Sequence, residues 1–79
     1  MIYVNNRFEE VMDILCKRLK ELRKIFGYSQ QQIADILHVG RPTYVCYEND
    51  IHDPNLNTIV LLSKIFDVSC DYLLGVSDY

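Results

Sequence analysis

The strongest constraint on this chain is a run of apolar residues that recur at alternating steps of four and three between residues 6 and 26. Steps of three and four place side chains on one face of an α-helix. The run therefore predicts a long first helix with a single buried stripe. The members of the stripe are Phe8, Met12, Leu15, Leu19, Leu22 and Phe26.

Capping signals after this run predict two short helices. Gly27 ends the first helix, because glycine takes the left-handed conformation without steric cost. Ser29 and Gln32 have the spacing of a capping box, so a second helix of about eight residues runs to Leu37. Pro42 is tolerated in a first helical turn and fits a third helix from about residue 41 to 47.

The last third of the chain predicts a fourth and a fifth helix. Residues 49–54 form a loop, and Asn55 can cap a helix with apolar residues at helical spacing from Leu56 to Phe66. Ser69 caps a final helix that Gly75 ends. Since no segment alternates with the period of a β-strand, the expected fold is all-α with five compact helices.

Composition predicts one globular domain over residues 1–79, since the 79 residues are 49% hydrophobic and 24% charged. Cys16, Cys46 and Cys70 form neither a CxxC pair nor an even disulfide set, which favours a reducing, cytoplasmic setting. The N-terminus lacks the pattern of a signal peptide, and no apolar run is long enough to span a membrane. We therefore expect no membrane association.

Signs of catalysis are missing from the sequence. His38 and His52 fall in predicted turns, and no cysteine or histidine pair has metal-ligand spacing. Neither a glycine-rich phosphate loop nor a nucleophile elbow is present. The sequence predicts no enzyme, metal, cofactor or small-molecule ligand.

Two short helices joined by three or four residues form a helix-turn-helix unit, here at about residues 29–48. In such units the second helix lies in the major groove of DNA, which has the width of one helix. The net charge of −3 opposes DNA binding, so a local cluster of positive charge is required. Five of the eight basic residues do cluster in the first helix: Lys17, Arg18, Lys20, Arg23 and Lys24.

The segments RLKELRKIFGYSQQQIADIL, VGRPTYVCYEND, PNLNTI and FDVSCDYLLG lie between residues 18 and 75. Together they resemble the lambda-repressor-like (Xre-type, Cro-repressor-like) helix-turn-helix family. The resemblance implies a bacterial or phage-type transcriptional regulator that binds a double-stranded DNA operator as a homodimer. Repression is the default expectation, because the sequence shows no separate ligand or activation domain. It also places Tyr44 and Tyr47 in the core.

The resemblance further implies a set of DNA-contacting positions. Arg41 is the best base reader, because a guanidinium fork can bind guanine O6 and N7 together; a phosphate contact alone is the alternative. Gln30 matches a phosphate-binding position, or is a solvated helix-opening residue. Asn49 matches another phosphate contact, or is an ordinary turn residue. The full set is Gln30, Gly40, Arg41, Pro42, Thr43, Cys46 and Asn49.

The chain departs from the family pattern on the reading surface. Pro42, Val45 and Cys46 stand where relatives carry polar side chains, and they cannot pair with base edges in the usual way. Direct reading would then depend on Arg41 and Thr43. Cys46 also raises a redox-sensing hypothesis, although no resolving cysteine is evident.

Other departures affect turns and exposed positions. Gly40 replaces the usual Ser or Thr cap, and His38 and Asp50 replace glycines. Apolar residues stand where relatives are polar, at Ile36, Ile51 and Leu61. Exposed apolar patches mark partner surfaces, so the alternative function is a protein-interaction module or an antagonist of another regulator.

Overall fold

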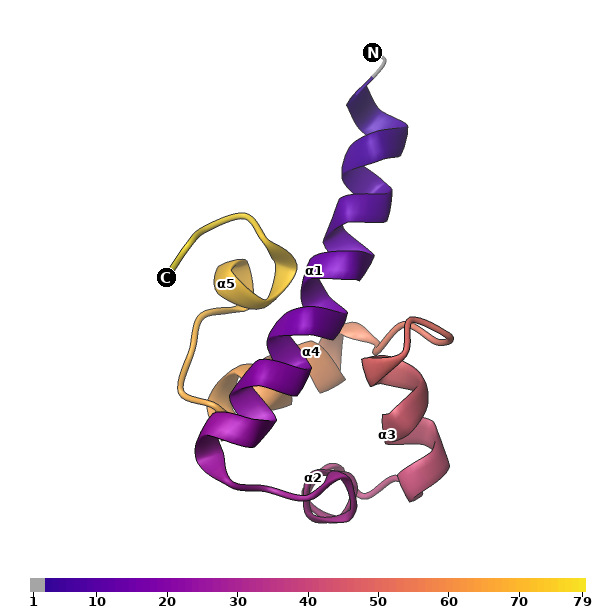
Figure 1. The fold of residues 1–79 in the computed structure, drawn as a ribbon, viewed down its shortest axis with the longest axis vertical. Coiled ribbons are helices and arrows are strands. Elements are labelled where there is room, and N and C mark those ends of the chain that lie inside the picture. The colour runs from indigo at the N-terminus through magenta and orange to yellow at the C-terminus, as the bar shows by residue number, and fades with distance from the viewer. Residues whose placement is uncertain (1–2) are drawn as a thin grey trace.

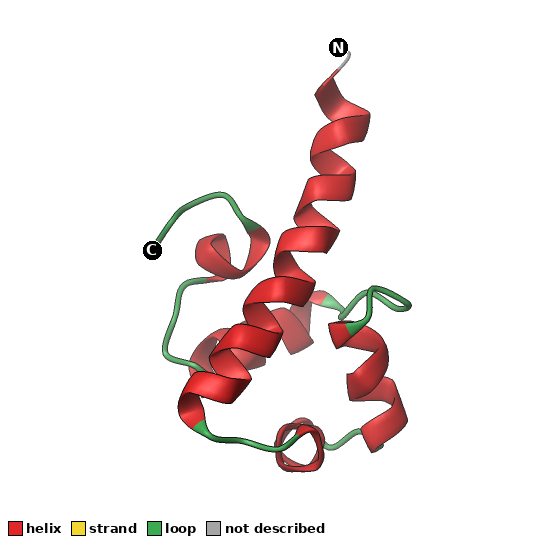
Figure 2. Ribbon diagram, in the orientation of Figure 1, coloured by secondary structure: helices red, strands yellow, loops and turns green. Residues whose placement is uncertain are grey.

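The computed structural model describes the backbone of residues 3–79 and the side chains of residues 11–79. Figure 1 shows a small bundle of helices, and Figure 2 shows only helices and loops in this part of the chain. The all-α, five-helix prediction is confirmed for the described residues. The helices are α1 (Tyr3–Phe26), α2 (Gln30–Leu37), α3 (Arg41–Glu48), α4 (Leu56–Ile65) and α5 (Cys70–Leu74).

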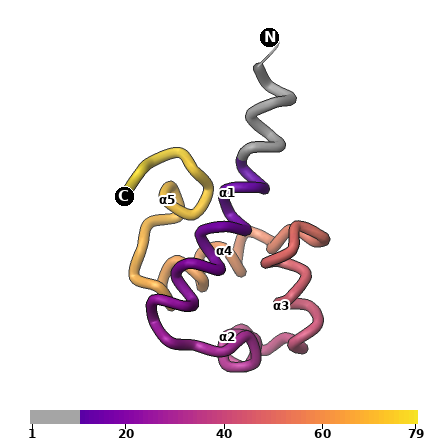
Figure 3. The backbone as a smooth tube through the Cα atoms, viewed as in Figure 1, coloured from indigo at the N-terminus to yellow at the C-terminus, as the bar shows by residue number. Residues whose placement is uncertain are grey.

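The path of the chain places α2 and α3 side by side at one end of the molecule (Figure 3). α2 packs against α3, while α1 packs against both α3 and α5. α4 returns the chain to α5, which it also contacts. α1 is therefore the scaffold that fixes α3 relative to the C-terminal helix.

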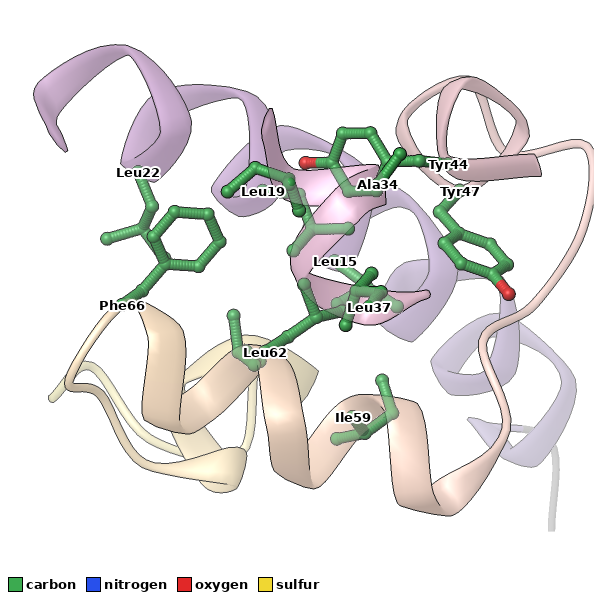
Figure 4. Packing of buried hydrophobic residues seen from close by; sticks show 12 residues of the cluster. Leu15, Leu19, Leu22, Ala34, Leu37, Tyr44, Tyr47, Ile59, Leu62 and Phe66 are labelled. Carbon is green, nitrogen blue, oxygen red and sulfur yellow. The ribbon is translucent and has the colours of Figure 1, made fainter. Parts of the chain in front are cut away.

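The core lies between these helices and contains most of the residues that the apolar spacing predicted (Figure 4). The exceptions include Leu56, which is 83% exposed, and Met12 and Ile65, which are half-buried. Tyr44 is completely buried and Tyr47 is 9% exposed, which confirms their core positions. Phe26 is 45% exposed, although its ring meets that of Phe66 edge-on at 5.6 Å. The prediction for Phe8 concerns a side chain outside the described residues. The cluster comprises Leu15, Leu19, Leu22, Ile33, Ala34, Leu37, Tyr44, Tyr47, Ile59, Leu62, Phe66 and Leu73.

The predicted helix caps are formed. Ser29 Oγ accepts from the Gln32 backbone N–H at 3.0 Å, and Gln32 Oε1 accepts from the Ser29 N–H at 2.7 Å, so the capping box is complete. Asn55 caps α4 and Ser69 caps α5 in the same side-chain-to-backbone manner. These bonds satisfy N–H groups that have no partner within the helix.

Helix ends differ from the sequence prediction by a few residues. α1 begins at Tyr3 rather than Asn6, and α3 continues to Glu48. Phe66 caps the end of α4 instead of lying inside it. Terminal residues are the least determined by apolar spacing, because capping and tertiary packing decide them.

Two turns contain His38 and Asp50 at positions where the family pattern has glycine. His38 (φ 59°) and Asp50 (φ 58°) both adopt the left-handed conformation. This region costs energy for residues with a Cβ, although Asp and His occupy it more often than most. The turns that follow α2 and α3 therefore keep the expected geometry.

In the part of the chain that the structure describes, no helix has both the length and the apolar character needed to cross a bilayer.

Candidate nucleic-acid interface

The α2–α3 unit has the form of a helix-turn-helix. Three residues, 38–40, connect the two helices. Ala34 is fully buried, and its small side chain permits the close packing of α2 on α3. Tyr44 and Tyr47 face the core, which orients the opposite face of α3 toward solvent.

The first turn of α3 lies on that exposed face. Arg41, Pro42 and Thr43 are exposed. Gly40 is the N-cap with φ −71° and ψ 153°, and it supplies no side-chain hydrogen bond to the helix. No acidic residue occupies the first turn. Pro42 has no N–H, and the Thr43 N–H donates to the Gly40 carbonyl at 3.1 Å. The start of α3 therefore offers chiefly the Arg41 guanidinium to an anionic partner.

Gln30 belongs to the same surface although it lies on α2. Its side chain is half-buried, and its Oε1 accepts a hydrogen bond from Arg41 Nη2 at 3.2 Å. The structure thus brings together five of the predicted site residues, which are Gln30, Gly40, Arg41, Pro42 and Thr43.

The two other predicted site residues lie farther along α3. Cys46 is half-buried one turn beyond Pro42, and Val45 beside it is also half-buried. Asn49 is exposed at the C-cap, at the opposite end of the helix from Arg41. All three cysteines are free, and Cys16 is the buried one.

A buried ion pair supports the interface from behind. Arg23 on α1 donates from Nε to Glu48 Oε2 at 2.6 Å and from Nη2 to Oε1 at 3.2 Å. The side chains of Arg23 and Glu48 are 15% and 2% exposed. Gln30 Nε2 also donates to Glu48 Oε1, at 3.2 Å. One carboxylate therefore connects α1, α2 and α3.

The charge states of this pair follow from their contacts. Burial alone would raise the pKa of Glu48, but the hydrogen bonds from Arg23 and Gln30 outweigh it and lower that pKa. The hydrogen bond to Glu48 raises the pKa of Arg23. Burial raises the pKa of the nearby Tyr44 hydroxyl, which makes no hydrogen bond of normal geometry. At neutral pH the cluster is a neutral phenol beside an ionised pair.

Two of the basic residues predicted to attract DNA have other roles. Arg23 forms an ion pair with Glu48. Arg18 lies 4.0 Å above the Tyr72 ring and donates to the backbone carbonyls of Tyr72 and Ser77. These arginines hold α3 and the C-terminal segment against α1. Their charges are therefore not free to attract DNA, although the cluster in the sequence suggested that they would be.

The remaining members of the basic cluster are lysines. Lys17 pairs with Asp13 at 3.6 Å on the surface. Lys20 and Lys24 make no ion pair among residues 11–79, and Lys24 is exposed. Of the five basic residues in the α1 cluster, only Lys20 and Lys24 are therefore left without an ion pair among residues 11–79.

Glu48 is a residue of the candidate site that sequence reasoning missed. It is 1% exposed and binds Arg23 and Gln30, whereas the sequence shows only an acidic residue near the end of the third helix. Apolar spacing does not identify such a residue, because its partners lie 25 and 18 positions away.

Comparison with known proteins agrees with this geometry. The helix-turn-helix family profile matches residues 19–73, more than half of the chain. The chain belongs to the lambda-repressor-like helix-turn-helix family. The match begins inside α1 and ends in α5, so it spans the whole arrangement around the α2–α3 unit.

Individual relatives are bacterial and phage regulators. The chain is 46% identical over 61 residues to the HTH-type transcriptional regulator ImmR of Bacillus subtilis, covering 77% of this chain and 48% of that protein. It is 47% identical over 58 residues to the SPbeta prophage-derived regulator YonR of the same organism, covering 73% and 54%. The cryptic phage CTXphi transcriptional repressor RstR of Vibrio cholerae is 30% identical over 61 residues, covering 77% and 55%. The chain spans about half the length of the curated relatives it matches.

Proposed function

We propose that this chain binds double-stranded DNA in a sequence-specific manner through the start of α3 and regulates transcription, with repression as the default. The observation that carries the proposal is the exposed first turn of α3, where Arg41 lies beside Gln30 on the packed α2–α3 unit. A relative with 30% identity is named as a transcriptional repressor. The family is one of regulators, and no catalytic role is proposed.

The proposed roles follow from exposure and chemistry. Arg41 reads a guanine edge, and Thr43 reaches a base or a phosphate. Gln30 and Asn49 contact phosphates on either side of α3. Gly40 allows the backbone to approach closely, while Pro42 and Cys46 make apolar contacts, for which a thymine methyl is the suitable partner.

We further propose that residues 1–79 act as one unit, that the active form is a homodimer, and that it works in the cytoplasm, where bacterial DNA lies. A single short helix contacts few base pairs, whereas two copies related by a two-fold axis read two half-sites about one helical turn apart. The operator is then expected to be palindromic.

The test is selection from a random duplex library at low salt, followed by affinity measurements on the best site and its single-base variants. Arg41→Ala should lose preference at one base pair per half-site, by about 1–3 kcal/mol. Asn57→Ala, an exposed change on α4, is the control and should bind like the parent.

Absence of any enriched sequence would overturn the proposal. Weak binding that Arg41→Ala does not change would do the same for the role of α3. Attention would then move to a protein partner at the exposed apolar residues Ile36, Ile51 and Leu61, which are 45%, 64% and 46% exposed.

A further inference from the structure

The side-chain amide of Gln30 bridges two groups with opposite hydrogen-bonding character. Its Nε2 donates to Glu48 Oε1, and its Oε1 accepts from Arg41 Nη2, both at 3.2 Å. A carboxylate only accepts hydrogen bonds and a guanidinium only donates them. Just one of the two orientations of the Gln30 amide satisfies both neighbours. The reversed orientation would place oxygen against oxygen and NH₂ against guanidinium.

Glu48 is the fixed point of this arrangement. Its side chain is 2% exposed, and Arg23 holds it through two hydrogen bonds. Arg41 is exposed, and the bond to Gln30 is its only hydrogen bond to another side chain among residues 11–79. The long, exposed side chain of Arg41 on α3 is therefore linked to the buried Glu48 carboxylate through the Gln30 amide.

We propose that Glu48 is a positioning residue for sequence recognition. It sets the orientation of the Gln30 amide, and that amide presents its oxygen to Arg41 and holds the guanidinium at the start of α3. Glu48 itself touches no DNA. The inference rests on the proposed DNA-binding function.

One consequence is that phosphate contact and base reading are coupled. The Nε2 group of Gln30 has two hydrogens, of which Glu48 uses one. The second can donate to a phosphate oxygen while Oε1 still holds Arg41. A phosphate bound at Gln30 would therefore stabilise the amide orientation that positions the base-reading group.

The test measures base preference rather than total affinity. The measured quantity is the ratio of the Kd for an operator changed at the base pair read by Arg41 to the Kd for the best site. Gln30→Met removes both hydrogen bonds at similar length. It should weaken binding to all sites and also lower the ratio by about two- to twelvefold, the cost of ordering one long side chain. Gln31→Met is the matched control, because Gln31 bonds only to Asp35 on the same helix.

Two variants isolate Glu48. In Glu48→Gln the new amide gives its oxygen to Arg23 and its NH₂ to Gln30, which reverses the Gln30 amide and should lower the ratio as Gln30→Met does. The swap Gln30→Glu/Glu48→Gln places an acceptor beside Arg41 again. It should restore the ratio to within about twofold of the parent, while the move of the negative charge from buried position 48 to position 30, at the DNA-facing surface, weakens binding to all sites. A purely structural role for Glu48 does not predict this rescue.

The outcomes are decisive in each direction. An unchanged ratio in Gln30→Met, or a swap that fails to restore it, would overturn the proposal while DNA binding itself stands. If Arg41→Ala alters preference at no base pair, the positioning of Arg41 has no role in recognition and the proposal is also overturned.

A measurement without DNA covers the case in which Glu48 variants do not fold or the chain binds no duplex. NMR of the arginine side chains should show slower guanidinium rotation for Arg41 in the parent and in Gln31→Met than in Gln30→Met. Equal rotation in all three proteins would show that the chain of hydrogen bonds from Glu48 through Gln30 does not hold Arg41. Slow rotation that depends on Gln30, in a chain that binds no DNA, would confirm these hydrogen bonds but refute the proposed DNA-binding function.

Discussion

Replacing Arg23 with methionine should destabilise the fold severely at pH 7. The change leaves the Glu48 carboxylate, 2% exposed, without its cationic partner. Removing one member of a buried ion pair costs about 3–5 kcal/mol, because an unpaired charge stays in a region of low dielectric. The total stability of a domain is about 5–15 kcal/mol, so a large part of it is lost. Urea unfolding followed by far-ultraviolet circular dichroism measures the change.

Two controls separate the buried charge from the loss of an arginine as such. Arg23→Met/Glu48→Leu removes both charges and should recover most of the stability, since apolar replacements of a buried pair are often neutral or better. Lys17→Met breaks the exposed pair with Asp13, whose side chains are 70% and 68% exposed, and should have little effect. A loss below about 1 kcal/mol in Arg23→Met would refute the reasoning.

The pH dependence of stability is a second test of the Arg23–Glu48 pair. Glu48 has its pKa lowered below the ordinary value of 4.5, chiefly by Arg23 against the opposing effect of burial. Its contribution to stability is therefore fully present above about pH 4.5 and is lost as the pH falls through the lower, folded-state pKa. In Arg23→Met, burial should raise that pKa, so the variant should lose stability as the pH rises. The difference between parent and variant should be larger at pH 7 than at pH 4.5.

Two further predictions concern the ends of helices. Gly27 and Gly75 both have positive φ, but a Cβ at Gly75 would meet Ile14 Cδ1 at 2.7 Å whereas one at Gly27 meets nothing within 4 Å. Gly75→Ala should therefore lower the unfolding temperature more than Gly27→Ala, and equal shifts would contradict the packing of α5 on α1. Ser29→Ala removes the side-chain acceptor of the capping box at α2 and should cost about 1 kcal/mol in urea unfolding, whereas Ser77→Ala outside the helices should cost much less.

Much of the fold could be predicted from the sequence because local rules decide it. Alternating steps of three and four placed Leu15, Leu19 and Leu22 on the buried face of α1. The Ser29 capping box and the Asn55 cap identified the starts of α2 and α4. Each of these signals depends on residues within four positions of one another, and such spacing is visible in a sequence.

The interactions that shape the candidate site could not be predicted in this way. Arg18 reaches Tyr72 and Ser77, and Arg23 reaches Glu48, over separations of 25 to 59 residues. A sequence shows that a residue is charged but not which distant partner neutralises it. The basic cluster of α1 therefore suggested a surface that attracts DNA, although both of its arginines make contacts within the protein.

The measurement that tests the central claim most directly is the salt dependence of binding to the best selected duplex. In the proposed interface, Gln30 and Asn49 contact phosphates on the two sides of a base contact at Arg41. The logarithm of the binding constant should fall with the logarithm of salt concentration, with a slope of about −0.9 for each phosphate that a lysine or arginine such as Arg41 neutralises. Arg41→Met should reduce that slope by up to about one per half-site, whereas Gln30→Met removes no charge and should leave the slope nearly unchanged. A nearly flat salt dependence would contradict DNA binding through this face, because an apolar interface responds little to salt.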